Sequence, residues 1–519
     1  MSLLSIGMSG LNAAQGSLSV LSNNIANVNT PGYSRQQTTQ NANANNPYGG
    51  VFIGSGTTLA DVRRVYNEFL DQAYQNSTSL NNDAKAYSSQ ASAIDKTLSD
   101  KTTGMSSVLS AFFAAVQTSS ANPSDVSARQ VLLTSAQTLS NRFNSISNQL
   151  NQQKESINGQ LSTMSDQVNQ LTASIASLNK QITQVQGSSN SAPANLLDAR
   201  NEAVRSLNEL VGVTASEKNG VFSVSTGTGQ SLVLGDQSNT ISAVPSASDP
   251  SQYTIQLNAG GGTAIDLGNV LSGGSIGGLL RYRSDALMPA INDLGRIAIA
   301  TADTVNSQLG QGLDLNGDFG TSLFKDINSA AAIAQRSQGA AGNSVGSGNL
   351  NVSIKDSSKL STYDYKVTFT SGSNYTVMRS DGKAMGAFDT TTTPPPVIDG
   401  FTLALDGKGP VGAGDSFKVS PTANGATNIG TDLTDANKIA FAGPLLGEGS
   451  KTNQGTGTFT PPTLTLPIDI HGGADTAQLR TGIEHSMPVK MVFGKPAADG
   501  TQAYTLNDSQ GNPIGSGTI

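Results

Sequence analysis

The sequence contains no cysteine, no tryptophan and only two histidines, and charged residues are scarce. Without cysteine the chain can form neither a disulfide framework nor a thiolate metal site. This absence indicates no compartment, because a protein exported unfolded through a narrow channel also benefits from having no cross-links. Charged residues make up 13% of the chain, about half of the ~25% usual in soluble proteins. Amide and hydroxyl side chains must therefore supply most of the surface polarity, which suits a protein that packs against its own copies.

The few charges are acidic in sum. The net charge of −7 and the pI near 4.9 argue against a nucleic-acid partner and an anionic membrane, which both require clustered basic residues. No stretch approaches ~18 uninterrupted apolar residues, so we expect no membrane insertion. Residues 1–20 lack the basic region of a secretory signal, so any export should proceed without a cleaved signal peptide.

Apolar residues recur at heptad spacing near the amino terminus and predict a helix with a narrow apolar seam. No charged residue precedes Arg35, although 13% of 34 positions would be about four. In a tube of repeating subunits a charge here would repel its own copies, whereas neutral amides would not. The seam requires a partner helix. We call it the assembly seam, and it comprises Leu4, Leu11, Ala14, Leu18, Leu21 and Ile25.

The predicted helix should end between about Asn27 and Thr30. Pro31 disfavours the helical conformation of the preceding residue, and Pro31-Gly32 suits a type II turn. From chemistry alone, the asparagines before this turn could simply be a polar helix end. The stretch SGLNAAQ…LSNNIANVNTPGYSRQ nevertheless closely resembles the amino-terminal signature of the bacterial flagellar axial proteins. The motif positions are Asn23, Asn24, Asn27, Asn29, Pro31, Gly32, Tyr33 and Arg35.

This family comprises rod, hook and hook-associated proteins. The resemblance implies that the segment is unfolded during export through the flagellar secretion apparatus and then folds into the innermost coiled-coil layer of a tube. The elements NPSDVSARQVLL and GLDLNGDFGTSLF resemble the hook-associated branch that joins hook to filament. Rod proteins are much shorter, and the hook protein lacks the long helical segment.

The resemblance also implies partners and a location. The expected partners are copies of the chain, the hook protein, other hook-associated proteins and the filament, outside the cell. An export chaperone would bind a carboxyl-terminal helix. Family members end in a second heptad-bearing helix, whereas this chain stops at GNPIGSGTI, so we expect a truncated sequence. The assembly seam would then lack its partner and be poorly ordered in a monomer.

The patterning predicts an α+β multidomain fold in which a long helical coiled-coil or bundle domain carries an inserted hairpin and precedes outer β-rich modules. The segment 61–98 reads as a helix, Gly104 separates it from the next one, and Ser124 or Asp125 should cap a very long third helix. The expected domains are an amino-terminal axial segment 1–60, a helical domain 61–335 with its insertion around 213–270, a β-rich module 340–425, and a second, apparently truncated β-rich module 426–519.

The long helix carries its own apolar seam. Its steps alternate four and three, except at Gln153, where two successive steps of four should relax a supercoil locally. A core helix of a bundle and a rod-like coiled coil are both compatible with this pattern. The long-helix seam comprises Leu139, Phe143, Ile146, Leu150, Ile157, Leu161, Met164, Val168, Leu171, Ile175, Leu178, Ile182 and Val185.

We find no pattern that calls for catalysis, a cofactor or a metal. Asp314 to Asp318 resembles the start of an EF-hand, but Phe319 and Lys325 stand where Gly and Glu are needed, so a turn is the better interpretation. His471 and His485 have no metal-ligand pattern around them. Two rivals remain open: a surface-exposed, adhesin-like β protein, and a glycan-cleaving enzyme on a flagellar scaffold, which would need a carboxylate pair.

Overall fold

A computed structural model of the chain describes residues 3–44, 46–48, 51–98, 104–188, 193–260, 262–268, 270–452, 460, 464, 467–472 and 474–519. Its contacts separate into two compact units. Unit 1 combines Met1–Thr97 with Gln149–Ala290, and unit 2 combines Leu98–Asn148 with Ile291–Ile519. The helix α4 (Val126–Ser188) contributes residues to both units.

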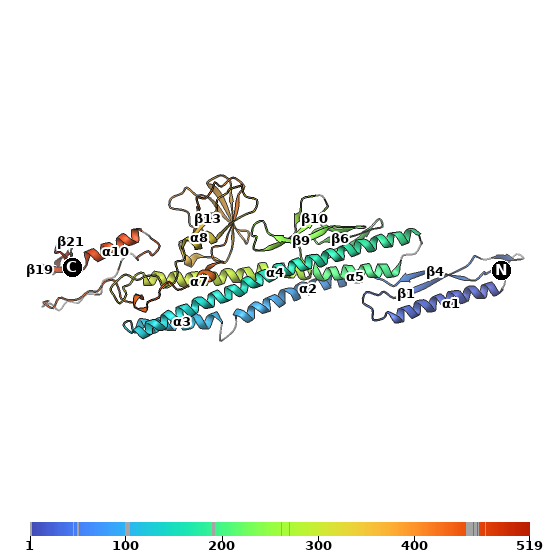
Figure 1. Ribbon diagram of the computed structural model, residues 1–519, viewed down its shortest axis with the longest axis horizontal. Coiled ribbons are helices and arrows are strands. Elements are labelled where there is room, and N and C mark those ends of the chain that lie inside the picture. The colour runs from blue at the N-terminus through green and yellow to red at the C-terminus, as the bar shows by residue number, and fades with distance from the viewer. Residues whose placement is uncertain are drawn as a thin grey trace. The chain divides into compact units, whose positions relative to one another are not determined.

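Unit 1 begins with α1 (Leu3–Ala26), which lies along a two-stranded ribbon (Figure 1). The ribbon pairs β1 (Gln36–Ala42) with β4 (Thr57–Arg64) in antiparallel register, and β2 (Asn46–Tyr48) pairs with β3 (Val51–Ile53) between them. The prediction of a helix from residue 61 is therefore wrong at its start. Residues 57–64 pair with β1 instead, and α2 (Glu68–Leu98) begins after the ribbon.

The helical part of unit 1 contains α2, the second half of α4, α5 (Ala194–Leu210) and α6 (Gly274–Tyr282), which continues through a π turn (Arg283–Leu287) into α7 (Met288–Leu309). The α2–α4 contact includes two hydrogen bonds of 3.1 Å from the Gln153 amide to Gln90. Gln153 is thus a polar position on the long-helix seam that binds a neighbouring helix through its side chain.

The insertion predicted as a hairpin consists of two antiparallel sheets, with strand orders β5-β6-β7-β8 and β11-β10-β9. Asparagines of α4 hold this insertion: Asn169 bonds both backbone groups of Ile241 at 2.8 Å, and Asn158 bonds Ser251 and Tyr253. The strands are β5 (Val213–Lys218), β6 (Val221–Thr226), β7 (Ser231–Leu234), β8 (Gln237–Ser238), β9 (Thr240–Pro245), β10 (Tyr253–Asn258) and β11 (Ile265–Asp266).

Unit 2 contains a helical part built on α3 (Met105–Ala121), the first half of α4, α7 and the short α8 (Ala330–Gln335). The Asp125 carboxylate accepts a hydrogen bond of 2.8 Å from the Ser127 backbone, which confirms the predicted cap of α4. Phe112 and Phe324 are fully buried with ring centroids 5.7 Å apart, so the loop after α7 packs on α3.

A β-rich module follows in unit 2, with a five-stranded sheet of order β12-β18-β14-β15-β16 and a separate β13–β17 pair (Figure 1). Tyr365, Val367 and Phe369 alternate with less buried residues along β14, and all three are buried on one face of the strand. The strands are β12 (Ser337–Gly339), β13 (Leu350–Ile354), β14 (Tyr365–Phe369), β15 (Asn374–Arg379), β16 (Ala384–Asp389), β17 (Phe401–Leu405) and β18 (Ser416–Val419).

The carboxyl-terminal part of unit 2 differs from the predicted β module. A helix, α10 (Ala474–Ser486), precedes an antiparallel sheet of β19 (Lys490–Pro496), β20 (Gln502–Asn507) and β21 (Pro513–Thr518). Between β18 and α10 lie α9 (Gly425–Asn428) and a 3-10 turn, Ala436–Lys438, and another 3-10 turn, Ser357–Lys359, lies between β13 and β14. The helix α10 was not predicted, because its sequence shows weak apolar periodicity.

Candidate assembly surfaces and structural sites

The helix α1 uses one face to pack on the ribbon. Ala13 is buried there, and the Ser17 hydroxyl lies 3.1 Å from that of Thr38 on β1. The Ser9 hydroxyl accepts a hydrogen bond of 3.2 Å from the Thr57 backbone on β4. A Cβ atom at Gly16 would lie 3.1 Å from Leu59, so small residues let helix and ribbon approach closely.

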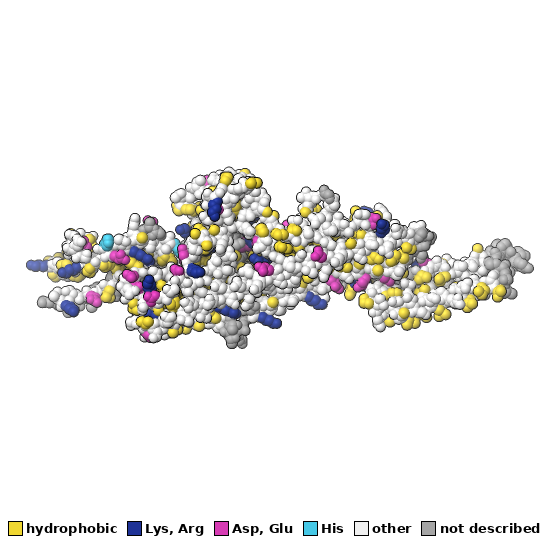
Figure 2. Space-filling model, in the orientation of Figure 1, with side chains coloured by type: hydrophobic (Ala, Val, Ile, Leu, Met, Phe, Trp, Pro, Cys, Tyr) yellow, Lys and Arg dark blue, Asp and Glu magenta, His cyan; other side chains and the backbone are white. Residues whose placement is uncertain are grey.

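The assembly seam lies on another face of α1, and its members are exposed. Exposed fractions are 76% for Leu4, 52% for Leu11, 61% for Leu18, 52% for Leu21 and 66% for Ile25, and Ala14 is exposed as well. Figure 2 shows hydrophobic side chains gathered over α1. The structure thus brings the predicted seam together on one helix face that the described part of the chain does not cover.

Exposed apolar side chains also occur where sequence reasoning did not place an assembly surface. Met8 on α1 and Val28 after it are exposed. At the start of α2, Phe69, Leu70 and Tyr74 are more than half exposed, as is Leu80 two turns later. These four side chains form a second exposed apolar group, on α2.

The asparagine motif connects the end of α1 to β1. Asn24 donates to the Gln36 carbonyl at 2.9 Å, and its Oδ1 accepts from the Gln36 backbone at 2.8 Å and from the Tyr33 hydroxyl at 2.8 Å. Asn23 donates to the same hydroxyl at 3.2 Å. Asn24 is therefore a bridge between helix and ribbon, rather than only a polar helix end.

The turn after α1 has the expected form. Tyr33 N–H donates to the Thr30 carbonyl at 3.2 Å, and Gly32 has φ +78, as the third residue of a type II turn requires. Asn27 bonds back to Asn23, and Thr30 donates to the Asn27 side chain at 3.1 Å. Of the remaining motif positions, Asn29 is exposed, and Arg35 accepts a hydrogen bond from the Val65 backbone through its carbonyl.

Most residues of the long-helix seam are buried within the chain. Leu139, Phe143, Ile146, Leu150, Ile157, Leu161, Val168, Ile175 and Ile182 are buried, whereas Met164, Leu171 and Leu178 are half-buried and Val185 is 37% exposed. This pattern is that of a core helix. Exposed large apolar side chains are present on α1 and at the start of α2, and also elsewhere, for example at Phe113 on α3 and Val131 on α4.

Two arginines are buried in unit 2 and bind backbone carbonyls. Arg129, 1% exposed, donates to the carbonyls of Pro123 at 2.6 Å, Ala436 at 3.3 Å and Ile439, and its guanidinium faces the Phe441 ring at 5.1 Å. Burial lowers the Arg129 pKa. Arg336 donates to the carbonyls of Ile327 and Val352, and burial lowers its pKa to about 10. Both side chains thus bind backbone carbonyls of neighbouring segments of unit 2.

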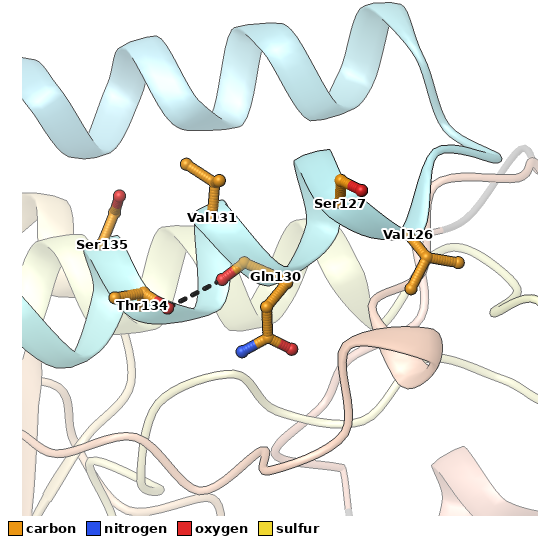
Figure 3. Close-up of a pocket in the computed structure, with 6 residues that line it drawn as sticks. All are labelled: Val126, Ser127, Gln130, Val131, Thr134 and Ser135. Carbon is orange, nitrogen blue, oxygen red and sulfur yellow. Dashed lines mark hydrogen bonds between the residues drawn. The ribbon is translucent and has the colours of Figure 1, made fainter.

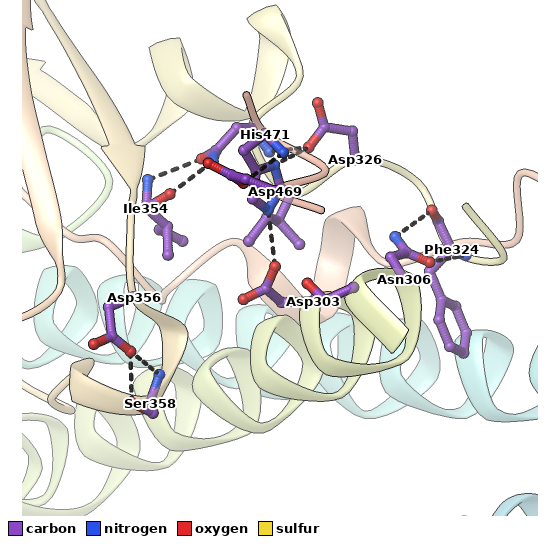
Figure 4. A network of polar contacts seen from close by, with 12 residues as sticks. Asp303, Asn306, Phe324, Asp326, Ile354, Asp356, Ser358, Asp469 and His471 are labelled. Carbon is purple, nitrogen blue, oxygen red and sulfur yellow. Dashed lines mark hydrogen bonds and ion pairs between the residues drawn. The ribbon is translucent and has the colours of Figure 1, made fainter. Parts of the chain in front are cut away.

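A polar network surrounds His471 in unit 2 (Figure 4). His471 Nε2 lies 2.9 Å from Asp303 Oδ1 on α7, and Nδ1 lies 3.7 Å from Asp326. Beside it, the buried Ile468 exchanges two hydrogen bonds of 2.7 Å with the Gln311 side chain. His471 therefore helps to dock the segment 467–472, which agrees with a packing role.

Both partners of the His471 pair have shifted pKa values. The hydrogen bond with Asp303 raises the His471 pKa, against an opposing effect of burial, and the charges of Asp303, Asp326 and Asp469 raise it further. Burial alone would raise the Asp303 pKa, but the hydrogen bonds from His471 and Ser357 and the His471 charge hold it below its usual value. The geometry thus favours an imidazolium–carboxylate pair.

Two surface pockets in unit 2 are lined by few chemically reactive side chains. One of about 510 Å³ lies over the first turns of α4 (Figure 3), lined by Val126, Ser127, Gln130, Val131, Thr134 and Ser135. The Thr134 hydroxyl there donates to the Gln130 carbonyl at 2.9 Å. A second, of about 250 Å³, includes Arg336, whose guanidinium already binds carbonyls. Neither contains a nucleophile–base pair.

Four acidic residues in unit 2 hold local structure through hydrogen bonds. Asp314 Oδ1 accepts hydrogen bonds from the backbones of Asn316 at 2.7 Å and Asp318 at 3.0 Å, as expected for a turn. Asp406 accepts from the Lys408 backbone, and Asp415 accepts from the backbones of Gly412 and Ser344. Asp399 accepts from the Tyr365 hydroxyl. Among the described residues no cluster of three or more metal-ligating side chains occurs.

A helix long and apolar enough to cross a membrane is not found among the described residues.

In unit 1 the Asp198 carboxylate on α5 contacts two residues next to the asparagine motif and its ribbon. It accepts from the Ser34 backbone at 3.1 Å and forms a 2.7 Å ion pair with Arg64. Sequence reasoning missed Asp198, because nothing local to α5 indicates a partner so distant along the chain.

Three family models match the chain. The helical domain of the flagellar hook-associated protein FlgK matches residues 91–324, the flagella basal body rod protein model matches residues 4–33, and a D2-like domain model of flagellar hook-associated protein 1 matches residues 339–421. These matches cover the asparagine motif, the helical region and the β-rich module.

Whole-chain comparisons agree. Flagellar hook-associated protein 1 of Escherichia coli is 33% identical over 92% of this chain and 89% of that protein, and that of Salmonella typhimurium is 34% identical over 85% and 79%. The structure of the flagellar hook junction protein FlgK from Burkholderia pseudomallei is similar with a TM-score of 0.69 and 29% identity, covering 86% of this chain and 84% of that one. The chain therefore belongs to the flagellar hook-associated protein 1 family, whose members are structural proteins of the bacterial flagellum.

Proposed function

We propose that this chain joins hook to filament by packing the assembly seam of α1 against helices of neighbouring subunits. As a member of its family, the chain is a structural component of the flagellum at the hook junction. The observation that carries the packing proposal is the seam itself. Five of its large apolar side chains are at least half exposed, on a helix without a charged side chain.

The energetic scale supports assembly through this face. Full burial of an exposed leucine contributes roughly 1.5–3 kcal/mol; because Leu4, Leu11 and Leu18 are about half to three quarters exposed, covering these three would contribute roughly 3–6 kcal/mol before the cost of association. Because α1 contains no acidic or basic side chain, this burial would desolvate no charge. A ring or tube places identical seams near one another, where this neutrality also avoids repulsion between copies.

The proposed partners are copies of the chain, the hook protein, other hook-associated proteins and the filament. We place the assembled protein outside the cell, exported without a cleaved signal peptide, and we propose that an export chaperone binds a carboxyl-terminal helix before secretion. A purely structural role without enzymatic activity is supported by the carboxylates of the β-rich module, because Asp406 and Asp415 bind backbone amides of their own turns.

The test replaces seam leucines by charged residues in cells that make the full-length protein. We expect Leu11→Glu and Leu18→Glu to abolish filament attachment while hooks still form, because each variant would bury an unpaired carboxylate. Asn12→Glu is the matched control, since Asn12 is an exposed polar position of α1 off the seam. Normal filaments in both leucine variants would contradict the proposal. An adhesin-like role would instead predict normal motility with lost surface attachment.

A further inference from the structure

One carboxylate on α5 holds two segments that are far from it in the sequence. Asp198 is 7% exposed, and each of its two oxygens has a separate partner. Oδ1 binds Arg64 Nη1 at 2.7 Å, and Oδ2 accepts the Ser34 N–H at 3.1 Å. The Arg64 side chain is 11% exposed, so the ion pair is largely shielded from water. Such a pair is costly to break from one side, because the remaining charge stays buried.

The two partners of Asp198 belong to the two sides of the ribbon and lie at the same end of it. Ser34 precedes β1, Arg64 ends β4, and Gln36 pairs directly with Arg64 across the ribbon. Next to this pair, the Val65 N–H donates to the Arg35 carbonyl at 2.8 Å. Through Asn24, Gln36 is also bonded to α1. A single carboxylate therefore fixes the point at which both α1 and the ribbon leave the helical part of unit 1.

A second contact lies one helical turn further along α5. A Cβ atom at Gly32 would lie 2.8 Å from the Glu202 carboxylate, so the turn after α1 rests directly on this side chain. Glu202 pairs with Arg205, which lies 3.5 Å from Asp71 on α2. Asp198 and Glu202 thus form one edge of α5 on which the Pro31–Arg35 loop is seated.

We propose that Asp198 is a positioning residue that fixes the direction in which α1 presents the assembly seam relative to α5. Arg64 and the Ser34 amide are the groups that it holds, and Asn24 transmits this constraint to α1. Only the effect on assembly rests on the proposed function, because the contacts of Asp198 with Arg64 and Ser34 form within a single chain and are here called the clamp. Loss of Asp198 frees α1 and its ribbon as a body and leaves the seam intact but wrongly directed.

The first test measures amide hydrogen exchange in the full chain. Loss of a hydrogen bond to a charged group should raise the exchange rate of the Ser34 amide by about tenfold or more in Asp198→Asn, and further in Asp198→Ala. Arg64→Gln, which removes the positive charge of the ion pair, should also raise the exchange rate of the Ser34 amide. Asp166→Asn is the control, because Asp166 is exposed on α4. Unchanged Ser34 exchange in Asp198→Ala would overturn the proposal.

The second test measures the orientation of α1 within unit 1. Because the chain has no cysteine, spin labels at Asn12→Cys on α1 and Ser174→Cys on α4 report one distance distribution within unit 1. We expect a broader distribution in Asp198→Ala, with unchanged thermal unfolding of the helices, which a merely structural loss would lower. An unbroadened distribution would refute the positioning role. Filament attachment in cells separates the two proposals. If Asp198→Ala raises Ser34 exchange and broadens the distance distribution but filaments attach normally, Asp198 positions α1 as proposed, and the proposed effect of this position on assembly is contradicted.

Discussion

Replacing Asn24 by alanine should loosen the connection between α1 and the ribbon. The substitution removes three hydrogen bonds of 2.8–2.9 Å, two with the Gln36 backbone and one with the Tyr33 hydroxyl. At roughly 0.5–1.5 kcal/mol each, and with the site partly open to water, we expect a loss of about 2 kcal/mol in the local opening free energy. That loss corresponds to roughly thirtyfold faster exchange of the Gln36 amide.

The assay is amide exchange followed residue by residue, with Asn29→Ala as the matched control. Asn29 belongs to the same motif and is exposed, so its replacement should leave the Gln36 amide unchanged. Asn24→Asp should fall between the wild type and the alanine variant, because a carboxylate still accepts from the Gln36 N–H and the Tyr33 hydroxyl but cannot donate to the Gln36 carbonyl. A Gln36 amide that exchanges at the wild-type rate in Asn24→Ala would refute the argument that this asparagine joins helix and ribbon.

Three further predictions concern unit 2 and the long helix. The folded-state pKa of His471 is raised above its ordinary 6.5, so the charged imidazole stabilises docking of residues 467–472 fully below pH 6.5, and this stabilisation is lost as pH rises through the folded-state pKa. The pKa of Asp303 is lowered, so the stabilisation from its carboxylate is lost only as pH falls below the ordinary value of 3.8. Protection of the Ile468 amide, corrected for intrinsic exchange, should therefore fall as pH rises above 6.5 in the wild type but not in His471→Gln, and equal pH profiles would contradict this. Arg129→Lys should lower the free energy of unfolding by about 3 kcal/mol in denaturant titrations, against little change for the exposed Arg63→Lys, since lysine cannot reach the same carbonyls. Phe143→Ala on the fully buried seam of α4 should cost about 3–5 kcal/mol by the same measurement, and a cost near zero would mean that this helix face is not core.

The sequence predicts the elements whose pattern is local. The heptad spacing from Leu4 to Ile25 predicts α1, the long-helix seam predicts a long helix that could be either a bundle core or a coiled coil, and Pro31-Gly32 predicts the end of α1. The α+β class followed from the change to alternating residues such as Val367 and Phe369. The division at residues 60, 335 and 425 stays a prediction, as do the assembly roles of the seam and motif residues.

The sequence does not predict features that depend on distant partners. The strand β1 is polar except for Ala42 and shows no apolar alternation, so only its pairing with β4 makes it a strand. For the same reason the predicted helix began too early, at residue 61. Asn24 meets Gln36, and Asp198 meets Arg64, only after that ribbon has formed. These side chains are polar residues of ordinary sequence context, and their importance arises from tertiary contacts.

The central claim is that the assembly seam is open in the free chain and covered in the flagellum. Thiol reactivity tests it directly, because the wild-type sequence has no cysteine. We predict that Leu18→Cys reacts rapidly in the free chain and is protected in isolated flagella, whereas Ala13→Cys, buried against the ribbon, reacts slowly in both. A Leu18→Cys thiol that reacts equally fast in free protein and in assembled flagella would contradict the account.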